Sequence, residues 1–428
     1  MVEMIRKINP TKKVIICIDG PNPLAKVTIQ RKQKYRNQYK DNISLPQKDV
    51  FDHFQTKYKE SVFHYLHVAC QKAPLNRLEV IYFSNLCPGE GEANMMNYYR
   101  NFRQSKDFDP DLTYAIDSRD NDLFFLGLQM HQRNVYIVRM YQHLNLTWFS
   151  IDGFRRNLLN RFPDRPEPER IIDDIVALSF FSGNDFIPQF PDLCDDQEDS
   201  FQLFLGSYHD VPIEAGFLTE EGHLNPLFFK VFIYHLLRRF EPEFKEDQLE
   251  IFRCSQPNFS SELLKDMSEQ ILRALSWILL YYQVNLPNWS YIYPYSQSPP
   301  LCLLSNYIDT FDAEFTLDQP PSPFLKQFLT NSIYEYESLP LSLIQLKFSG
   351  HPLAEFFPFI NDSEDVENLP IIDLEKILPI FNEELSKLPK TIAEENQFDT
   401  PLIFNHLSNK FETLQIPPAL PIFPPLLS

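Results

Sequence analysis

The sequence predicts an α/β fold with a largely parallel sheet and flanking helices, followed by a mostly helical second lobe. The chain has 428 residues, of which 43% are hydrophobic and 14% aromatic, so it can bury a large core. In its first part, short apolar runs alternate with stretches of helical periodicity, as in folds built on a parallel sheet. Further on, the chain becomes rich in Leu, Phe, Tyr and Pro and keeps a helical period. We therefore expect an α/β domain over residues 1–204 and a helical lobe over residues 205–428.

The first strand is predicted at residues 14–18, an apolar run typical of a parallel strand that is buried on both faces. It ends at Asp19-Gly20, and a helix should follow directly because Asn22 can cap it and Pro23 suits its first turn. Similar runs predict further strands at 78–83, 113–117 and 134–139. Ligands of such sheets bind beyond the carboxyl ends of the strands, so we expect the functional site at that edge.

Helical patterns separate the predicted strands and continue after them. They predict helices at about 48–72, 89–104, 120–131 and 170–182 in the first domain, and at 225–240, 261–283 and 370–388 in the second lobe. The acidic connector at 192–199 should be a solvated loop. Prolines exclude a helix interior at 416–425, which is predicted as an extended strap or a disordered end.

Charge and cysteine content restrict the function classes. Asp and Glu total 58 against 39 Lys and Arg, and the formal net charge of −19 repels a polyanion such as RNA, so any nucleic-acid site must be local. The six cysteines form no CxxC pair, which argues against a zinc site or a disulfide framework and for a reducing compartment. No stretch approaches 18 apolar residues, so we expect a soluble protein of the nucleus or cytoplasm without membrane contact.

Six carboxylates in four short segments predict a metal site. They are Asp19 in IDG, Glu90 and Glu92 in PGEGE, Asp120 and Asp122 in DND, and Asp185 in GND. Taken singly, each acidic pair is more often a solvated turn. Together, they adjoin apolar runs such as FFLGL and ALSFFSGNDFIP, where acids are costly unless a cation compensates them. Hard divalent ions are the usual partners, so the sequence predicts a two-metal-ion phosphodiester hydrolase.

The segment that follows Asp19 carries a second signal. Between Lys26 and Lys40 it contains six basic residues and no acid. One helical face carries Lys26, Gln30, Gln33, Lys34 and Asn37. An isolated basic helix is more often a solvated face. Because this one directly follows a predicted metal-site acid, we expect its stripe to anchor a terminal phosphate of the substrate.

These segments resemble the Xrn family of 5′→3′ exoribonucleases. The likeness is carried by IDGPNPLAKVTIQRKQKYRNQ, SNLCPGEGEANMMNYYR, SRDNDLFFLGLQMHQRNVYIVR and RIIDDIVALSFFSGNDFIPQFPDL, and in the second lobe by EAGFLTEEGHLN and LSWILLYYQVNLPNWSYIYPY. It covers nearly the whole chain in order. The resemblance implies a nuclease domain of the PIN or flap-nuclease kind. It also implies processive hydrolysis of single-stranded RNA from a 5′-monophosphate end to mononucleotides with Mg²⁺ or Mn²⁺, in RNA processing and mRNA decay.

The resemblance also implies roles for individual residues. The family's metal-site acids are matched by Asp19, Glu90, Glu92, Asp120, Asp122 and Asp185. Its 5′-phosphate pocket is matched by Lys26, Gln30 and Lys34. Aromatic residues around Trp277, Trp289 and Tyr293 match a block that supports the active-site lobe, although from their residue types alone they would be assigned to the core.

The chain departs from the family pattern at several points. Family members begin with a segment that carries another metal-site Asp and a stacking His, and we expect this strand and ligand to be missing here. Gln33 replaces a second arginine of the phosphate pocket, Ala93-Asn94 replace a His-Lys, and Ser296-Gln297 replace a His-Tyr. These changes should weaken the grip on the substrate.

Two alternative functions stay open at this point. A structure-specific flap endonuclease has a similar carboxylate site, although the PGEGE and GNDF contexts and the likeness in the second lobe argue against it. A catalytically impaired, RNA-binding relative would keep the fold and lose turnover. The six acids favour an enzyme, whereas the expected loss of the first segment favours the impaired relative.

Overall fold

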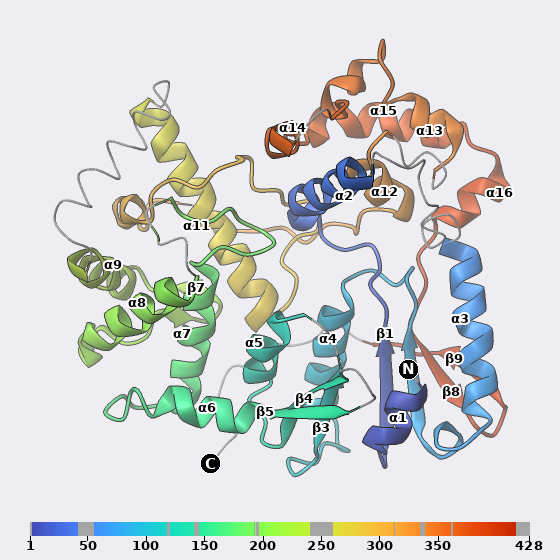
Figure 1. Cartoon of the computed structure of the whole chain (residues 1–428), viewed down its shortest axis with the longest axis horizontal. Helices are drawn as coiled ribbons and strands as arrows, with labels where there is room; N and C mark the ends of the chain where they lie inside the picture. The colour runs from blue at the N-terminus through green and yellow to red at the C-terminus, as the bar shows by residue number, and fades with distance from the viewer. Residues whose placement is uncertain are drawn as a thin grey trace. The chain divides into compact units, whose positions relative to one another are not determined.

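The computed structural model describes residues 2–41, 55–117, 120–140, 145–191, 193, 197–239, 260–311, 313–333, 339–360 and 363–416. These form two compact units, each made of separate chain segments. The first unit comprises the described residues within Met1–Met95, Trp289–Ile292 and Asp318–Pro417, and the second those within Met96–Asn288 and Tyr293–Leu317. Both units combine helices with small sheets, so the fold is mixed α/β (Figure 1). The predicted boundary between residues 204 and 205 divides the chain into two consecutive domains, which is a different kind of division from these units. It stays a prediction.

The first unit contains a four-stranded sheet in the order β1-β2-β8-β9. Its strands are β1 (Lys13–Cys17), β2 (Glu79–Phe83), β8 (Leu402–Asn405) and β9 (Lys410–Thr413). β1 and β2 are parallel, with Ile15 opposite Ile81, whereas β8 runs antiparallel to β2 and β9 antiparallel to β8. The predicted strands at 14–18 and 78–83 are confirmed. The region after residue 204 was expected to be mostly helical, and the two strands near its end, each only four residues long, give too short an alternation to be recognised.

Helices of the first unit come from both halves of the chain. The N-terminal part contributes α1 (Val2–Ile8), η1 (Leu24–Lys26), α2 (Val27–Asp41), α3 (Gln55–Cys70), η3 (Leu75–Arg77) and the beginning of α4 (Gly91–Arg103). The C-terminal part contributes α12 (Pro323–Thr330), α13 (Leu341–Gln345), η8 (Pro352–Phe356), α14 (Ser363–Glu367), α15 (Leu374–Ser386), α16 (Lys390–Ala393) and η9 (Glu394–Asn396). The predicted helices at 89–104 and 370–388 are confirmed. The helix at 48–72 is confirmed from residue 55, and residues 48–54 lie outside the described residues.

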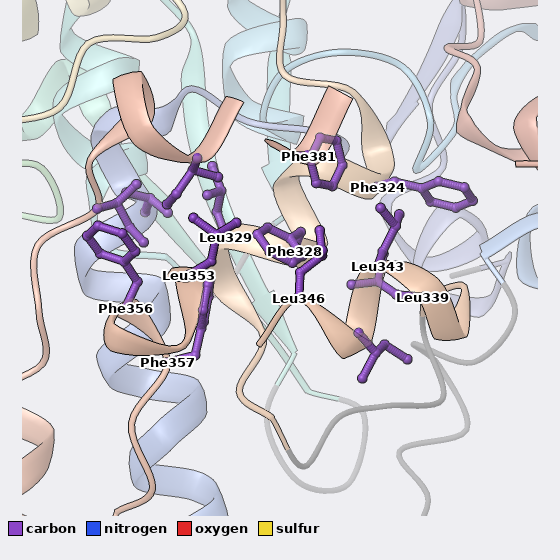
Figure 2. Close-up of a cluster of buried hydrophobic side chains, with 14 of the residues drawn as sticks. Phe324, Phe328, Leu329, Leu339, Leu343, Leu346, Leu353, Phe356, Phe357 and Phe381 are labelled. Carbon is purple, nitrogen blue, oxygen red and sulfur yellow. The ribbon is translucent and has the colours of Figure 1, made fainter. Parts of the chain in front are cut away.

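The main hydrophobic cluster of this unit joins the two halves of the chain. The basic segment comprises η1 and α2, residues 24–41. Leu24 and Val27, at its start, pack into a cluster formed mainly by residues 324–381. Phe328 is fully buried at its centre, with its ring 5.1 Å from those of Phe357 and Phe381 (Figure 2). Burial of apolar surface therefore fixes the basic segment to a part of the chain some 300 residues away.

The second unit contains a three-stranded sheet in the order β3-β4-β5 and a short hairpin. Its strands are β3 (Tyr114–Asp117), β4 (Val135–Met140), β5 (Leu146–Ser150), β6 (Thr219–Glu220) and β7 (His223–Leu224). β3 and β4 are parallel and confirm the predicted strands at 113–117 and 134–139, whereas β5 was not predicted and runs antiparallel to β4. Both larger sheets thus contain parallel and antiparallel pairs. The prediction of a largely parallel sheet is not confirmed.

Helices make up most of the second unit. They are α5 (Asp122–Gln129), α6 (Ile151–Leu159), α7 (Pro168–Phe180), α8 (Gln197–Asp210), η5 (Ile213–Ala215), α9 (Pro226–Arg239), α11 (Ser261–Gln283) and η6 (Leu301–Asn306). The helices predicted at 120–131, 170–182, 225–240 and 261–283 are confirmed. In the described part of the chain, none of the helices combines the length and hydrophobicity needed to cross a bilayer.

Two loop predictions fall largely on undescribed residues. In the acidic connector, residues 192 and 194–196 lie outside the described residues, and from residue 197 the chain is helical, so the loop prediction is wrong there. The physical reason is that acids are favoured in the first turn of a helix as well as in solvated loops. The predicted strap at 416–425 lies outside the described residues, apart from residue 416.

The hydrophobic cluster allows a stability prediction. Replacing Phe328 with Ala should lower the free energy of unfolding of the first unit by about 3–5 kcal/mol, because the cavity adds to the lost apolar burial. Urea denaturation followed by fluorescence measures the change. Leu341→Ala is the control, since Leu341 is 68% exposed and its loss should cost less than about 0.5 kcal/mol. Equal losses for both variants would contradict the central position of Phe328.

Candidate functional site

The loop after β1 and the loop after β2 are joined directly through their backbones. Gly20 N donates to Gly89 O at 3.0 Å, and Gly89 N donates to Pro21 O at 2.9 Å. A Cβ atom on Gly20 would lie 1.8 Å from Cys87 O, so only glycine allows this approach. Parallel pairing of β1 with β2 brings the two loops to the same edge. Asp19 is thereby held beside the PGEGE segment, as the sequence predicted for the carboxyl ends of parallel strands.

Asp19 is anchored to the beginning of α4. Gly91 N donates to Asp19 Oδ1 at 2.7 Å, and a Cβ on Gly91 would lie 3.2 Å from the same oxygen. The free amides of a first helical turn favour a carboxylate there. The second glycine of PGEGE thus lets the helix approach the Asp19 carboxylate closely.

Glu90 is buried and paired with a lysine of the basic segment. Lys26 Nζ lies 2.7 Å from Glu90 Oε1, both side chains are less than a tenth exposed, and Asn22 Nδ2 donates to the same oxygen at 3.5 Å. The prediction that Asn22 caps a helix is wrong: Pro23 is the N-cap of η1, and Asn22 contacts Glu90 instead. A residue predicted to bind the substrate and one predicted to bind a metal are therefore in direct contact.

The pKa of Glu92 is raised where these acids lie close together. Burial, followed by the nearby charges of Glu90 and Asp19, raises the pKa of Glu92 to about 7, although its backbone hydrogen bond and Lys26 oppose the shift. A carboxylate in such surroundings is stabilised by a proton or by a cation. Asp19, Glu90 and Glu92 are thus brought together in the first unit.

The other three predicted acids belong to the second unit. Asp120 is exposed, Asp122 is half-buried in the first turn of α5, and Tyr282 Oη donates to Asp122 Oδ2 at 3.0 Å. Asp185 is exposed in the turn after α7, where Asn184 Oδ1 accepts from the backbone amides at 186 and 187. Whether these acids join those of the first unit in one site stays a prediction.

A divalent cation fits the chemistry of these donors. All are carboxylate oxygens, which hard cations prefer, and burial together with the charges of Glu90 and Asp19 raises the pKa of Glu92. Over the described ranges, however, no three His, Cys, Asp or Glu side chains form a group ready to hold a metal ion. One reason in the first unit is that Lys26 Nζ already contacts Glu90.

The basic segment is only partly the solvated face that its composition suggests. Arg31 is buried, and its guanidinium donates to Phe356 O and Pro370 O. Lys34 Nζ donates to Asn331 Oδ1, while Gln30 lies half-buried on α2. Lys32 and Arg36 pair with Glu367. Most of these contacts are with residues 331–370 of the same unit.

Asp399 supports the loop that precedes PGEGE and was not found from the sequence. Ser84 Oγ donates to Asp399 Oδ2, Asp399 N donates to Leu86 O at 3.0 Å, and Lys59 Nζ lies 2.6 Å from Asp399 Oδ1. Its separation of more than 300 residues from the loop leaves no local signal that could have identified it.

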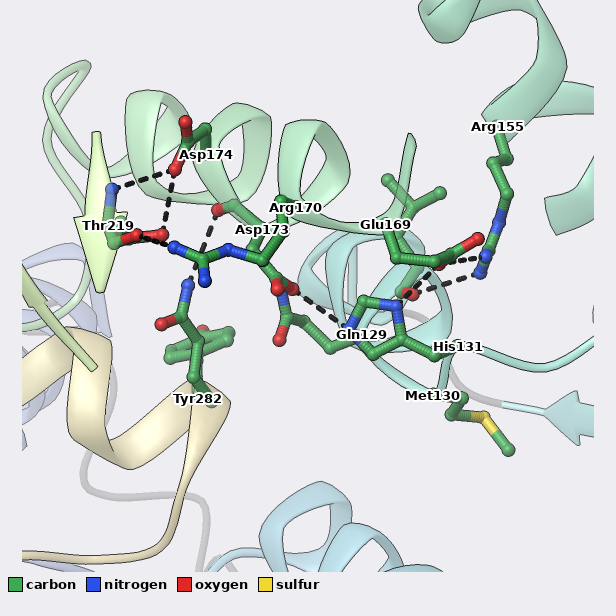
Figure 3. Close-up of polar contacts among 12 residues, drawn as sticks. Gln129, Met130, His131, Arg155, Glu169, Arg170, Asp173, Asp174, Thr219 and Tyr282 are labelled. Atoms are coloured by element: carbon green, nitrogen blue, oxygen red, sulfur yellow. Dashed lines mark hydrogen bonds and ion pairs between the residues drawn. The ribbon is translucent and has the colours of Figure 1, made fainter. Parts of the chain in front are cut away.

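A second missed feature is a buried polar network around His131 in the second unit (Figure 3). His131 lies between two carboxylates of α7, with Nδ1 2.6 Å from Glu169 Oε2 and Nε2 2.9 Å from Asp173 Oδ1. Arg155 pairs with Glu169, and Gln129 Nε2 donates to Asp173 at 3.0 Å. The spacing of four residues between Glu169 and Asp173, on one helical face, was the available signal. The network fixes the C-terminal end of α5, whose first turn holds Asp122.

Asp174 and the predicted aromatic block are structural. Asp174 is fully buried and accepts hydrogen bonds from Tyr208 Oη and from both nitrogen and oxygen donors of Thr219. Burial raises the pKa of Asp174 to about 6 against these hydrogen bonds. Trp277 and Tyr293 are buried in the second unit, and Trp289 accepts a hydrogen bond from Leu24 N in the first.

Comparison with known families identifies two matching regions. The family described as "XRN 5′-3′ exonuclease N-terminus" matches residues 1–64 and 52–141, and the family described as "Xrn1 helical domain" matches residues 166–251. The first region contains five of the six predicted acids, and the second contains Asp185. The matches thus include every predicted metal-site residue.

Similar full-length proteins carry related names. The 5′-3′ exoribonuclease 1 of Homo sapiens is 24% identical over 92% of this chain and 31% of the relative. The 5′-3′ exoribonuclease 1 of Saccharomyces cerevisiae is 24% identical over 60% of this chain and 20% of the relative. The 5′-3′ exoribonuclease 2 of the same yeast is 25% identical over 62% of this chain and 33% of the relative. The chain spans between about a fifth and a third of the length of these relatives.

The crowded carboxylates of the first unit predict a stability change on adding a cation. At pH 8 without metal, Glu92→Gln should raise the urea midpoint, because a carboxylate whose folded-state pKa is raised destabilises the fold above its ordinary pKa. Millimolar Mg²⁺ or Mn²⁺ should then raise the midpoint of the unchanged protein more than that of the variant. Glu394→Gln, on η9 of the same unit, is the control and should respond to the cation as the unchanged protein does. Equal responses from all three proteins would contradict a cation role for Glu92.

The His131 network predicts a loss of stability at alkaline pH. Burial alone would lower the pKa of His131, but Asp173 and Glu169 outweigh it and raise the pKa to about 9. Since this exceeds the unfolded value near 6.5, the stabilisation is complete below about pH 6.5 and is lost as pH rises through about 9. Urea unfolding should therefore show a loss of roughly 2–4 kcal/mol between pH 6.5 and 10. His131→Gln should remove most of this dependence of stability on pH. Replacing the exposed His209 with Gln is the control and should leave the dependence unchanged. An unchanged pH profile in the His131 variant would refute the role of His131.

Proposed function

Because the chain belongs to the Xrn family, we propose that it is a 5′→3′ exoribonuclease that degrades 5′-monophosphorylated single-stranded RNA to mononucleotides. The observation that carries the proposal is the convergence of Asp19, Glu90 and Glu92 at the start of α4, within a region that matches the family. Relatives that are named exoribonucleases and that match much of the chain support the same activity. RNA is accordingly the proposed partner, in the nucleus or the cytoplasm.

We propose that both sets of acids bind divalent cations, Mg²⁺ or Mn²⁺. When bound, two such ions would activate a water molecule and stabilise the leaving oxygen of an in-line displacement at phosphorus. The chain's own groups orient the carboxylates: the Gly91 amide holds Asp19, and the Tyr282 hydroxyl holds Asp122. Asp120 and Asp185 are exposed, which leaves them accessible to cations and substrate.

Lys26, Gln30 and Lys34 are proposed to bind the 5′-phosphate. They lie on η1 and one face of α2, next to the loop that carries Asp19. The contact between Lys26 and Glu90 supports a phosphate position adjacent to the metal-site acids. The parallel pairs β1–β2 and β3–β4 are compatible with the nuclease sheet of the PIN or flap-nuclease kind that we propose for this family member.

One observation favours a catalytically impaired relative as the second candidate. In this structure Lys26 already compensates Glu90, so one of the acids is partly neutralised without a cation. Such a chain would bind 5′-phosphorylated RNA and release it uncut. Turnover distinguishes the two candidates.

The activity test compares two RNA substrates that differ only at the 5′ end. With Mn²⁺, the purified protein should degrade 5′-phosphorylated single-stranded RNA at least tenfold faster than the 5′-hydroxyl form, because the terminal phosphate supplies an additional charge-assisted contact. The double variant Asp120→Ala, Asp122→Ala should lose hydrolysis by more than a hundredfold and keep RNA binding. Equal decay of both RNAs would remove the end-anchoring role, and an active double variant would remove the metal assignment.

A further inference from the structure

Several lysines are buried in the first unit, beyond those matched to the phosphate pocket. Lys326 on α12 and Lys347 after α13 are each less than a tenth exposed, as is Lys26. Lys is rarely buried to this degree unless it is paired. Lys26 lies 300 residues or more before the other two in the sequence, yet all three belong to the same compact unit.

Hydrogen bonds tie these lysines to the basic segment. Lys326 Nζ donates to Pro23 O at 3.3 Å, immediately before η1, which ends at Lys26. Lys34 Nζ donates to Asn331 Oδ1, and Lys347 Nζ donates to Asn331 O at 2.7 Å. α12 and its C-cap residue Asn331 therefore contact the basic segment at two points, through Lys326 just before η1 and through Asn331 at Lys34.

Three charged groups act on Lys326. They are the carboxylate of Glu90 and the ammonium groups of Lys26 and Lys34. Glu90 is already in contact with Lys26. Burial lowers the pKa of Lys326 to about 7; Glu90 counteracts this shift, and Lys26 and Lys34 add to it. No carboxylate of the described residues forms an ion pair with Lys326, so an anion from outside the chain would stabilise this buried ammonium group.

A structural role alone does not explain the residue type at this position. The contact with Pro23 O needs only one hydrogen-bond donor, which a glutamine could supply. A lysine instead places a costly charge in a buried site beside two like charges. An anion that binds next to Lys326 would offset the free-energy cost of burying its charge.

We propose that Lys326 is a specificity-determining residue that acts with Lys26 and Lys34 on the terminal phosphate of the RNA. The identity of the ligand rests on the proposed function, whereas the burial of Lys326 next to the basic segment rests on the geometry alone. A terminal phosphomonoester carries between one and a half and two negative charges near pH 7. An internal phosphodiester carries one, and a 5′-hydroxyl carries none. Lys326 thus adds selectivity for the end of the chain.

The test is binding of RNA in EDTA, which separates end recognition from cation binding and from hydrolysis. Fluorescence anisotropy compares two 3′-labelled oligoribonucleotides of identical sequence, one with a 5′-phosphate and one with a 5′-hydroxyl. The unchanged protein should bind the phosphorylated RNA more tightly. Lys326→Met should reduce affinity for that RNA by roughly 10- to 100-fold and leave affinity for the hydroxyl form unchanged, because one charge-assisted hydrogen bond is lost.

Two further variants make the result specific. Lys390→Met removes the same charge from an exposed position of the same unit and should alter neither affinity. Lys326→Gln keeps a donor for Pro23 O and removes only the charge, so it replaces the methionine variant if that variant does not fold. The glutamine variant should show the same selective loss.

The outcomes separate this inference from the proposed function. If Lys326→Met and Lys326→Gln keep the preference for phosphorylated RNA, or if the unchanged protein has none, the role of Lys326 is refuted. If the preference depends on Lys326 but Mn²⁺ produces no hydrolysis, the inference stands and the proposed exoribonuclease activity falls. Hydrolysis that keeps its preference in both Lys326 variants refutes the inference alone.

Discussion

The close approach of three carboxylates at the start of α4 is the constraint on which the first unit depends. Like charges in a partly buried place repel each other, so each acid must be held by a specific donor. The Gly91 amide holds Asp19, and Lys26 holds Glu90. The hydrogen bonds from Gly20 N to Gly89 O and from Gly89 N to Pro21 O keep the two loops in contact despite that repulsion. The glycines of IDG and PGEGE are therefore as necessary to the site as its acids.

This constraint explains why the C-terminal part of the chain belongs to the same unit as the N-terminal strands. A loop that carries repelling charges needs support from outside its own segment. Asp399 provides it by contacting Ser84 and Leu86, and the strands β8 and β9 extend the sheet beside β2. The basic segment receives similar support from the hydrophobic cluster around Phe328.

Local signals in the sequence were sufficient for most elements, and they indicated the candidate acids, whose role stays a prediction. The apolar run before Asp19 and the helical period around residues 261–283 depend on neighbouring residues, and both were confirmed. By contrast, the pairing of β8 with β2, the burial of Arg31 and the support from Asp399 depend on contacts across about 300 residues. Such contacts leave no periodicity to detect. For the same reason the sequence did not predict the partners of Arg31 and Lys34 in the basic segment, which lie far along the chain.

Glu90 differs from the other anchored acids in a way that links the proposed cation site to the proposed phosphate site. A backbone amide or a hydroxyl, as at Asp19 and Asp122, fixes a carboxylate without neutralising its charge. Lys26 fixes Glu90 with an opposite charge. An incoming phosphate would draw Lys26 toward itself, which would restore the negative charge of Glu90 for a cation. A cation on Glu90 would in turn release Lys26 for the phosphate. If both proposed sites are occupied, the single ion pair would make the two binding events favour each other, because each ligand would remove the partner that opposes the other.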